Sequence, residues 1–218
     1  MTLGQIADDI ILRLTQSAPS DDSEIEKAQV MYLIAQTRDM LVKQYLDKQI
    51  AQGQPLDTQY KDRVSAETME LEDTDEVAQD NERLFVTIPN QPLPLYNDLG
   101  VLQVLTQEYL PVLRQRAENF TVYQDLRFAR PSSFNLCFYR DNRKIIIKGL
   151  SQKNRDNDKF IIDYFPALAS QTLTDTTDAR ISDALLPQLT ELVETVMKRQ
   201  MYESVQDQEN DGVQEPSK

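Results

Sequence analysis

The spacing of apolar residues changes twice along this chain of 218 residues, and this change limits the folds that the chain can adopt. In residues 3–14, apolar side chains recur every three or four positions, as they do on one face of an α-helix. Residues 84–89 (LFVTIP) instead place apolar side chains at every second position and end at a proline, which is typical of a β-strand. The helical spacing returns in residues 185–197. We therefore expect helices at both ends of the chain and β-structure between them.

Two antiparallel helices are expected in residues 1–52. Thr2 and Gln5 have the spacing of a capping box, so the first helix can begin almost at the N-terminus. A polar turn follows it. The second helix is expected to run from about residue 23 to residue 52 and to end at Gly53, because glycine favours the backbone conformation that stops a helix.

A closing helix is expected near residues 184–202, where a broad apolar face spans an arc of about 140°. Its proline, Pro187, is tolerated if it lies in the first turn, where no backbone hydrogen bond is lost. The apolar face consists of Leu185, Leu186, Leu189, Leu192, Val193, Val196 and Met197. We predict that this face packs against the N-terminal helix pair. The residues expected in that contact are Leu189, Leu192 and Val196 on one side and Ile6, Ile10 and Tyr32 on the other.

The middle of the chain is expected to be rich in β-strands. The predicted strands are residues 84–89, residues 99–105, two strands around a turn at Asp141-Asn142, and residues 159–165, with a short helix within residues 106–120. The expected fold class is therefore α+β: a helical bundle formed by the N- and C-terminal helices, a β-rich central insertion and an extended C-terminal tail. The expected boundaries are 1–52 for the helical hairpin, 53–175 for the insertion, 176–202 for the closing helix and 203–218 for the tail.

The composition excludes several kinds of chemistry. The chain has no histidine, so it cannot form a histidine-dependent catalytic triad or an imidazole metal site. With one cysteine, Cys137, it cannot form an ordinary zinc site either, and we expect Cys137 to be a small buried side chain. The five glycines are far apart, which leaves no phosphate-binding loop. No cofactor and no metal are expected.

Charge is distributed unevenly along the sequence. Residues 67–82 hold eight acidic side chains and no basic one, whereas residues 127–159 hold nine Lys or Arg and three Asp. The net charge of the whole chain is -13, which opposes wrapping of DNA and binding to an anionic membrane. The start of the chain also lacks the basic region of a signal peptide.

The order of these parts resembles a known family. Residues 1–42 give a short helix, a polar turn and a long helix, and residues 162–197 give a last strand that ends in proline, a polar connector and a closing helix. This order is similar to that of the head–tail adaptor, or ring, proteins of short-tailed bacteriophages, especially those of crAss-like phages. The likeness covers both ends and the general plan of the middle.

The resemblance implies a structural protein of the virion, assembled in the cytoplasm of the host bacterium. Such adaptors form a ring of about twelve copies, a closed arrangement of heterologous contacts, below the portal protein. The ring extends the DNA channel to further tail proteins, and DNA passes through without specific binding. The helical domain of these proteins makes the ring, and their C-terminal segment reaches the portal. No membrane is involved.

The resemblance and the charge pattern together suggest interface residues. Acidic residues of one subunit are expected to face the basic hairpin of its neighbour, and residues 203–218 are expected to dock on the portal or between subunits. The candidates are Asp73, Asp75 and Glu76 in the acidic run, Arg140, Arg143 and Lys144 in the hairpin, and Val205 and Val213 in the tail.

Two alternatives remain open. The first is a carboxylate-dependent hydrolase of cell-wall glycan, because such an enzyme needs only two carboxyl groups and this chain has 36 acidic residues. One branch of the adaptor family is linked to peptidoglycan hydrolysis, but its catalytic residues have no match here. The second alternative is a cytosolic scaffolding protein unconnected with phage.

Overall fold

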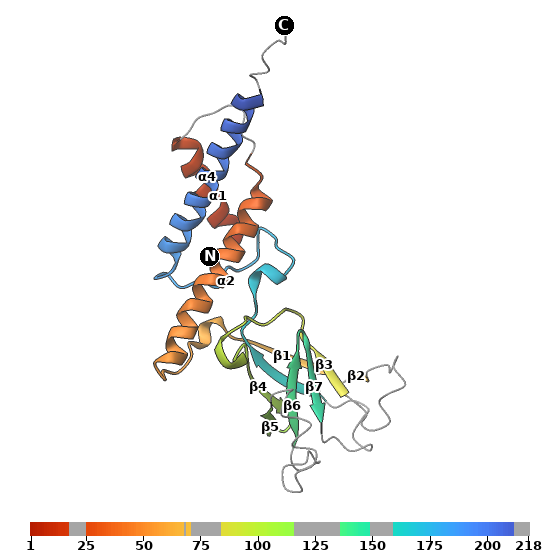
Figure 1. The fold of residues 1–218 in the computed structure, drawn as a ribbon. Helices are drawn as coiled ribbons and strands as arrows, with labels where there is room; N and C mark the ends of the chain where they lie inside the picture. Colours follow the sequence, from red (N-terminus) through yellow and green to blue (C-terminus); the bar gives the residue numbers. More distant parts are fainter. Residues whose placement is uncertain (18–24, 68, 71–83, 116–135, 149–158, 212–218) are drawn as a thin grey trace. The chain divides into compact units, whose positions relative to one another are not determined.

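The computed structural model describes residues 1–17, 25–67, 69–70, 84–115, 136–148 and 159–211. The chain divides into two compact units. The helical unit comprises Met1–Gln52 and Gln171–Lys218, and the β-unit comprises Gly53–Ser170 (Figure 1). Helices and a β-sheet are both present, which confirms the mixed α+β class.

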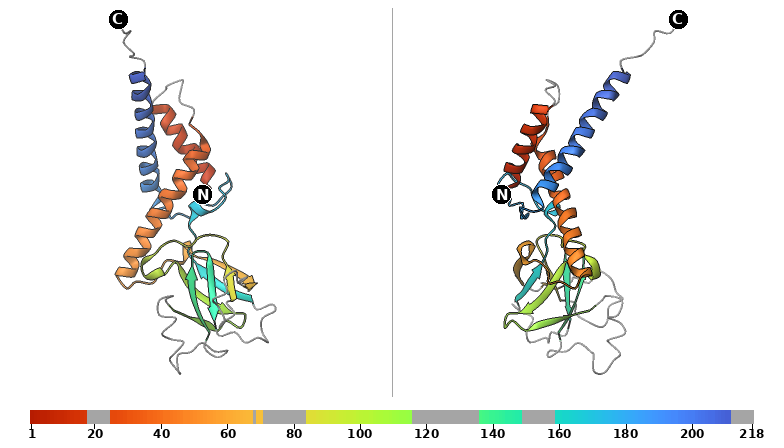
Figure 2. Two further views of the ribbon diagram at one scale, coloured as in Figure 1. Left: turned by 45° about the vertical axis from the view of Figure 1, so that its right-hand side comes forward. Right: turned by 90° about the vertical axis from the view of Figure 1, so that its left-hand side faces the viewer.

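The helical unit contains three long helices: α1 (Leu3–Ser17), α2 (Lys27–Ala51) and α4 (Leu186–Asp211). Each of them contacts the other two. Figure 2 shows α2 running antiparallel to α1 and α4. Pro187 falls in the first turn of α4, as expected.

The ends of the first two helices follow local sequence signals. The capping box is present: the Thr2 amide donates to Oε1 of Gln5 at 3.0 Å, and the Gln5 amide donates to Oγ1 of Thr2 at 3.3 Å. Helix α2 ends before Gly53, which has a φ of 65°, a conformation that glycine adopts without strain. Helix α2 begins at Lys27 and not near residue 23, and the side chain of its N-cap, Glu26, makes no capping bond.

The apolar core of the helical unit joins both ends of the chain. On α4, the buried side chains lie four residues apart at Leu189, Val193 and Met197. The partners buried on the other helices are Leu3, Ile6, Ala7, Ile10 and Leu14 on α1 and Val30, Met31, Ile34, Ala35, Leu41, Val42 and Leu46 on α2. The expected burial of Leu189, Ile6 and Ile10 is confirmed.

Two residues of the predicted contact were placed wrongly. Val196 is 40% exposed and Tyr32 is 49% exposed, so neither belongs to the core. The predicted face of α4 was too broad, because the buried apolar side chains of α4 form a single seam at positions i, i+4 and i+8. Leu192, beside that seam, is only partly buried.

Backbone hydrogen bonds tie the N-terminus to the connector that precedes α4. The amide of Leu3 donates to the carbonyl of Thr177 at 2.8 Å, and the amide of Ala179 donates to the carbonyl of Met1 at 3.2 Å. Lys27 adds ion pairs to Asp8 and Asp175. These contacts make the connector an integral part of the helical unit.

Helix α4 continues to Asp211, beyond Tyr202, at which the closing helix was expected to end. Residues 203–209 are rich in Glu and Gln, which are good helix formers. The first part of the acidic tail is therefore helical.

The β-unit contains one eight-stranded sheet. Its strands are β1 (Asp62–Glu67), β2 (Met69–Glu70), β3 (Leu84–Thr87), β4 (Val101–Thr106), β5 (Pro111–Arg114), β6 (Cys137–Asp141), β7 (Lys144–Lys148) and β8 (Lys159–Tyr164). Their order is β1-β8-β4-β5-β6-β7-β3-β2, and all neighbours are antiparallel except β5 and β6. The strands expected in residues 84–89, 99–105, 134–149 and 159–165 are confirmed.

The sheet nearly closes on itself. Strands β1 and β2 follow one another in the chain but lie at opposite edges of the sheet, so a single chain segment serves both edges. Closure of this kind protects edge strands from pairing with other chains. We call this unit the barrel from here on.

The helix expected within residues 106–120 is wrong. Residues 101–114 form a hairpin in which β4 turns into β5. Tyr109 has a φ of 61° in the turn, and Pro111 begins β5, a position where its missing amide disrupts little. The other expected turn is present, with Asn142 at a φ of 53° between β6 and β7.

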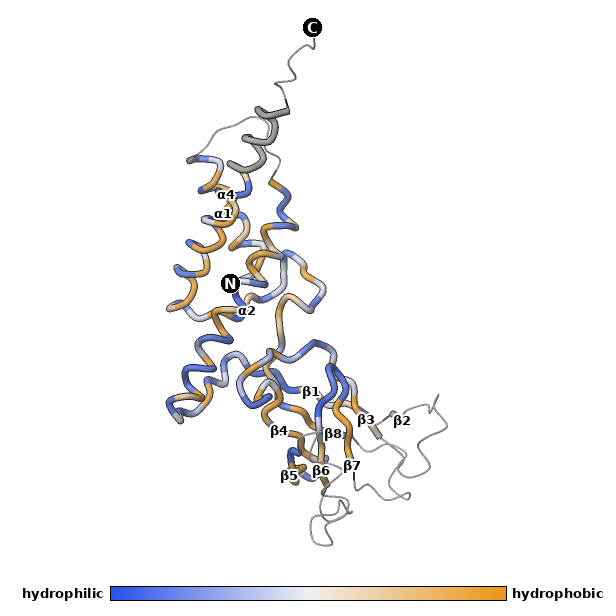
Figure 3. The backbone as a smooth tube through the Cα atoms, in the orientation of Figure 1, coloured by the Kyte–Doolittle hydropathy of each residue, from blue (hydrophilic) through white to orange (hydrophobic). Residues whose placement is uncertain are grey.

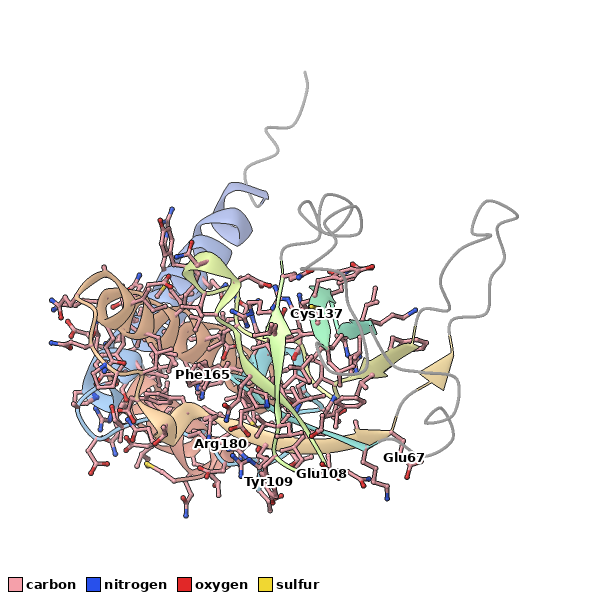
Figure 4. The ribbon with its side chains drawn as sticks, turned by 90° about the horizontal axis from the view of Figure 1, so that it is seen from below. Glu67, Glu108, Tyr109, Cys137, Phe165 and Arg180 are labelled. Atoms are coloured by element: carbon pink, nitrogen blue, oxygen red, sulfur yellow. The ribbon has the colours of Figure 1, made fainter. Side chains whose placement is uncertain are left out.

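The barrel interior is apolar. Its core residues are Val86, Ile88, Val101, Val104, Val112, Phe138, Ile145, Ile147, Phe160, Ile162 and Tyr164. The apolar residues of the strands stand out in Figure 3. Cys137 is a buried cysteine on β6, as predicted, and its burial raises the pKa of its thiol (Figure 4).

Candidate assembly surfaces

The three basic hairpin residues predicted for an interface all contact other residues of the barrel. Arg140 forms an ion pair with Asp98 at 2.6 Å. Arg143 donates to the carbonyls of Ile88 and Pro89, which fastens the hairpin to the end of β3. Lys144 lies over the ring of Phe85, 4.8 Å from its centre. Arg143 and Lys144 are nevertheless exposed, so they remain accessible to a partner.

The other predicted interface residues are not placed by the structure. Asp73, Asp75, Glu76 and Val213 lie outside the described residues. Val205 lies in α4, where only the backbone is described. The proposed pairing of acidic and basic segments therefore stays a prediction.

A buried carboxylate organises one side of the barrel. Asp163 on β8 is fully buried and lies on the face opposite the apolar core, since the core residues of β8 are its neighbours Ile162 and Tyr164. Arg63 donates to it through Nε at 2.6 Å and through Nη2 at 2.8 Å. Lys61 donates through Nζ at 2.9 Å, and Gln103 through Nε2 at 2.8 Å.

Strand register brings these groups together. Arg63 on β1 and Gln103 on β4 are both paired directly with Asp163 on β8. The pairing of β4 with β8 is irregular between Val101 and Gln103, and this irregularity is what puts Gln103 beside the carboxylate. The hydrogen bonds from Arg63 hold the pKa of Asp163 well below its usual range; burial opposes this, and the bonds from Gln103 and Lys61 add to it.

This network was not predicted from the sequence. The signal available was one acidic residue within the otherwise apolar residues 160–165. A charge at such a position requires partners, but the sequence does not indicate which of many basic residues they are. Because its donors surround Asp163 on one side of the sheet, the network stabilises the barrel and offers no free catalytic carboxylate.

Large apolar side chains are exposed on the barrel. Tyr109, Leu110 and Leu113 of the β4–β5 hairpin are each more than half exposed, and so is Tyr96. Figure 4 shows Tyr109 beside Glu108 at the tip of this hairpin. Clusters of this kind often mark surfaces that contact other proteins.

The helical unit has its own exposed apolar residues. Tyr32 and Met40 are eight positions apart on α2 and therefore lie on one face of the helix. Leu12 on α1 and Val196 on α4 are also exposed.

A pocket of about 420 Å³ lies between α1 and α4. Its lining includes Asp9, Arg13 and Glu194. Arg13 binds Asp9 at 2.8 Å and Glu194 at 3.5 Å, so these carboxylates are paired with a cation. A glycan hydrolase requires two carboxyl groups directed at a substrate, and this arrangement gives no support to that alternative.

The described residues contain no group of three or more His, Cys, Asp or Glu side chains placed to hold a metal ion. None of their helices combines the length and the apolar character needed to cross a membrane.

The described residues thus present exposed apolar and charged surfaces that can contact other proteins. A comparison with protein families gives the class: residues 5–215 match the model described as Phage tail ring protein 2, a ring protein family of crAss-like phages. Because the match covers nearly the whole chain, the chain belongs to this family. It is thus a component of the phage virion. The comparison with curated proteins finds no match.

Proposed function

We propose that the chain is the subunit of a head-to-tail adaptor ring, with about twelve copies arranged by rotation below the portal. The observation that carries this proposal is the family match over residues 5–215. In this proposal the ring extends the DNA channel toward the tail. The net charge of -13 supports it, because an acidic wall repels phosphates and lets DNA pass without binding.

We infer that the three helices act as a bundle that forms the main contact between neighbouring copies. Tyr32, Met40 and Val196 support this inference, since they expose apolar surface that a neighbour can cover. Charged side chains would then set the register of the contact. In particular, residues 67–82 of one copy would face Arg143 and Lys144 of the next.

The test is the mass and symmetry of the purified chain. Native mass spectrometry and electron microscopy should show a closed ring of about twelve copies. A strictly monomeric chain at high concentration, which also fails to join particles that contain the portal, would overturn the proposal. The charged contact is tested by Arg143→Glu combined with Lys144→Glu. Assembly should fall, and the size of the loss should change with salt concentration.

The C-terminal segment is the proposed contact with the portal. Residues 203–218 contain few apolar side chains, among them Val205 and Val213, so they cannot form a core by themselves. Truncation after Tyr202 should leave the stability of the helical unit nearly unchanged, because Leu189, Val193 and Met197 all precede it. The truncated chain should no longer join particles that contain the portal, and normal incorporation would contradict this role.

A further inference from the structure

Two arginines lie together at one end of the barrel. Strands β5 and β6 are parallel, so their C-terminal ends reach the same end of the sheet. Arg114 is the last residue of β5, and Arg140 lies near the end of β6. Each lies two residues after a core residue, Val112 or Phe138, and therefore on the inward face of its strand.

The two arginines have one carboxylate between them. Asp98 forms its ion pair with Arg140 at 2.6 Å. Residues Asn97 and Asp98 have φ values of 55° and 59°, which Asn and Asp tolerate better than most residues, and this turn directs Asp98 toward the barrel end. The group of Arg114, Arg140 and Asp98 therefore carries one positive charge in excess.

Arg114 has no ion pair or hydrogen bond to its side chain within the described residues. Its guanidinium lies over the ring of Phe138, 5.6 Å from the ring centre. Nη2 of Arg114 and Nη1 of Arg140 are both buried, and neither has a hydrogen-bond partner in the described part of the chain. Burial lowers the pKa of Arg114, Asp98 raises it and Arg140 lowers it further. A half-buried guanidinium with unused donors is costly unless an acceptor completes it.

Accessible surface remains at this group. The side chain of Arg140 is 19% exposed, and Arg114 is also partly exposed. This partly exposed pair suits a flat carboxylate, which two adjacent guanidinium groups can bind through several hydrogen bonds. It does not suit the backbone of duplex DNA, which the acidic chain also repels.

We propose that Arg114 and Arg140 form an anion site that binds an Asp or Glu carboxylate of a neighbouring copy of this chain. That a neighbouring copy supplies the carboxylate rests on the proposed ring, whereas the anion site itself does not. Each copy carries 36 acidic residues, so a neighbour supplies this chemistry readily. The bound carboxylate would neutralise the excess charge and connect the barrel of one subunit to the next.

The first experiment tests the site in the isolated full-length chain. The Nε–H signals of the arginine side chains are followed by nuclear magnetic resonance during titration with sodium acetate, sodium phosphate or sodium chloride at equal ionic strength. Acetate should shift the Arg114 and Arg140 signals in a saturable way. The Arg13 signal is the control, because Arg13 already binds Asp9 and Glu194. Absence of a saturable shift would overturn the site, and a shift with phosphate alone would overturn the preference for carboxylates.

The second experiment uses variants. Arg114→Met keeps an unbranched apolar stem without the guanidinium group and should weaken acetate binding at Arg140 about tenfold, whereas Arg13→Met should leave it unchanged. Arg114→Lys keeps the charge, loses the planar geometry and should give an intermediate affinity. An unchanged amide spectrum elsewhere in the barrel shows that the variants are folded. If Arg114→Met does not fold, the acetate affinity of Arg114→Lys alone tests the site.

The third measurement tests which molecule supplies the carboxylate. Arg114→Met should lower the fraction of chain in rings, and Arg114→Lys should restore part of it. If the wild-type chain binds acetate but Arg114→Met gives a normal ring yield, a neighbouring copy does not supply the carboxylate. A wild-type chain that binds acetate but forms no ring would overturn the proposed function. It would also exclude a neighbouring copy as the source of the carboxylate, but the anion site itself would stand.

Discussion

Among the described residues, each unit contains one charged side chain that is almost fully buried, and the two are held in different ways. In the helical unit, Arg38 is 1% exposed and binds Asp39, the next residue of α2, at 2.9 Å. It also donates to the carbonyl of Arg180 at 3.2 Å. In the barrel, Asp163 is fully buried and gathers donors from β1, from β4 and from Lys61, which precedes β1.

The difference shows what holds each unit together. Arg38 supplements a helix contact that is already apolar, with Leu189, Val193 and Met197 buried against α1 and α2. Asp163 is the point at which three neighbouring strands, β1, β8 and β4, meet. We therefore expect the barrel to depend on one carboxylate, and the helical unit to depend on its apolar seam more than on its buried charge.

The strongest test of this comparison is Asp163→Ala. Removal of one member of a buried ionic group leaves the others without their partner, which costs about 3–5 kcal/mol. Urea unfolding followed by hydrogen exchange should show the loss in the barrel strands. The control is Glu67→Ala, which removes an exposed ion pair with Lys159 and should cost less than about 1 kcal/mol. Equal losses for the two variants would contradict the special role of Asp163.

The apolar seam is tested by Leu189→Ala. A buried Leu→Ala change should lower the free energy of unfolding of the helical unit by about 2–3 kcal/mol. Val196→Ala, on the exposed side of the same helix, should cost less than about 0.5 kcal/mol. A similar loss for both variants in urea unfolding, followed by circular dichroism, would show that the seam is not where the structure puts it.

These two units also differ in how much of them the sequence could predict. The helices follow from local signals, such as the Thr2–Gln5 capping box and the apolar period of α4, so their existence was predictable. The width of the apolar face was not, because Val196 has the character of a core residue and is exposed only through the positions of α1 and α2. Local sequence signals determine where the helices form, whereas the packing of the helices determines which of their residues are buried.

In the barrel, the strands with regular patterns were predictable, and the pairing was not. Strand β1 has the mixed sequence DRVSAE, and β5 begins with a proline, so neither shows a strong strand pattern. The Asp163 network and the Arg114–Arg140 pair both depend on register between strands that are far apart in the sequence. One irregularity in the pairing of β4 places Gln103 beside Asp163, and no local pattern reports it.

The role of Arg38 is tested by Arg38→Met. Methionine keeps the apolar stem within the core and loses the bonds to Asp39 and to the carbonyl of Arg180. The expected loss is about 1–2 kcal/mol, less than that for Leu189→Ala, because hydrogen bonds to charged groups contribute modestly and the stem packing remains. Urea unfolding of Arg38→Met and Leu189→Ala under the same conditions shows which variant loses more unfolding free energy. A larger loss for Arg38→Met would show that the buried charge, and not the seam, holds the helical unit.

The smallest expected effect is the response of the barrel to acid. The pKa of Asp163 in the folded chain lies well below its usual range, so the folded state favours the charged carboxylate. This contribution to stability is complete above the pKa of the unfolded chain, about 3.9, and is lost as the pH falls from there toward the folded pKa. At pH 4 the loss should be only about 0.4 kcal/mol, because half of the unfolded chains then carry the proton. Below pH 4 it should grow by about 1.4 kcal/mol per pH unit.

Other carboxylates titrate in the same range, so the measurement is the difference in unfolding free energy between the wild-type chain and Asp163→Asn from pH 7 to pH 3. This difference should be constant at neutral pH and should shrink below about pH 4.5. The corresponding difference for Leu189→Ala, which removes no titrating group, should stay level over the same range. If the Asp163→Asn difference also stays level, the carboxylate is not held in its charged form by Arg63, Lys61 and Gln103, and the contrast with the apolar seam of the helical unit no longer holds.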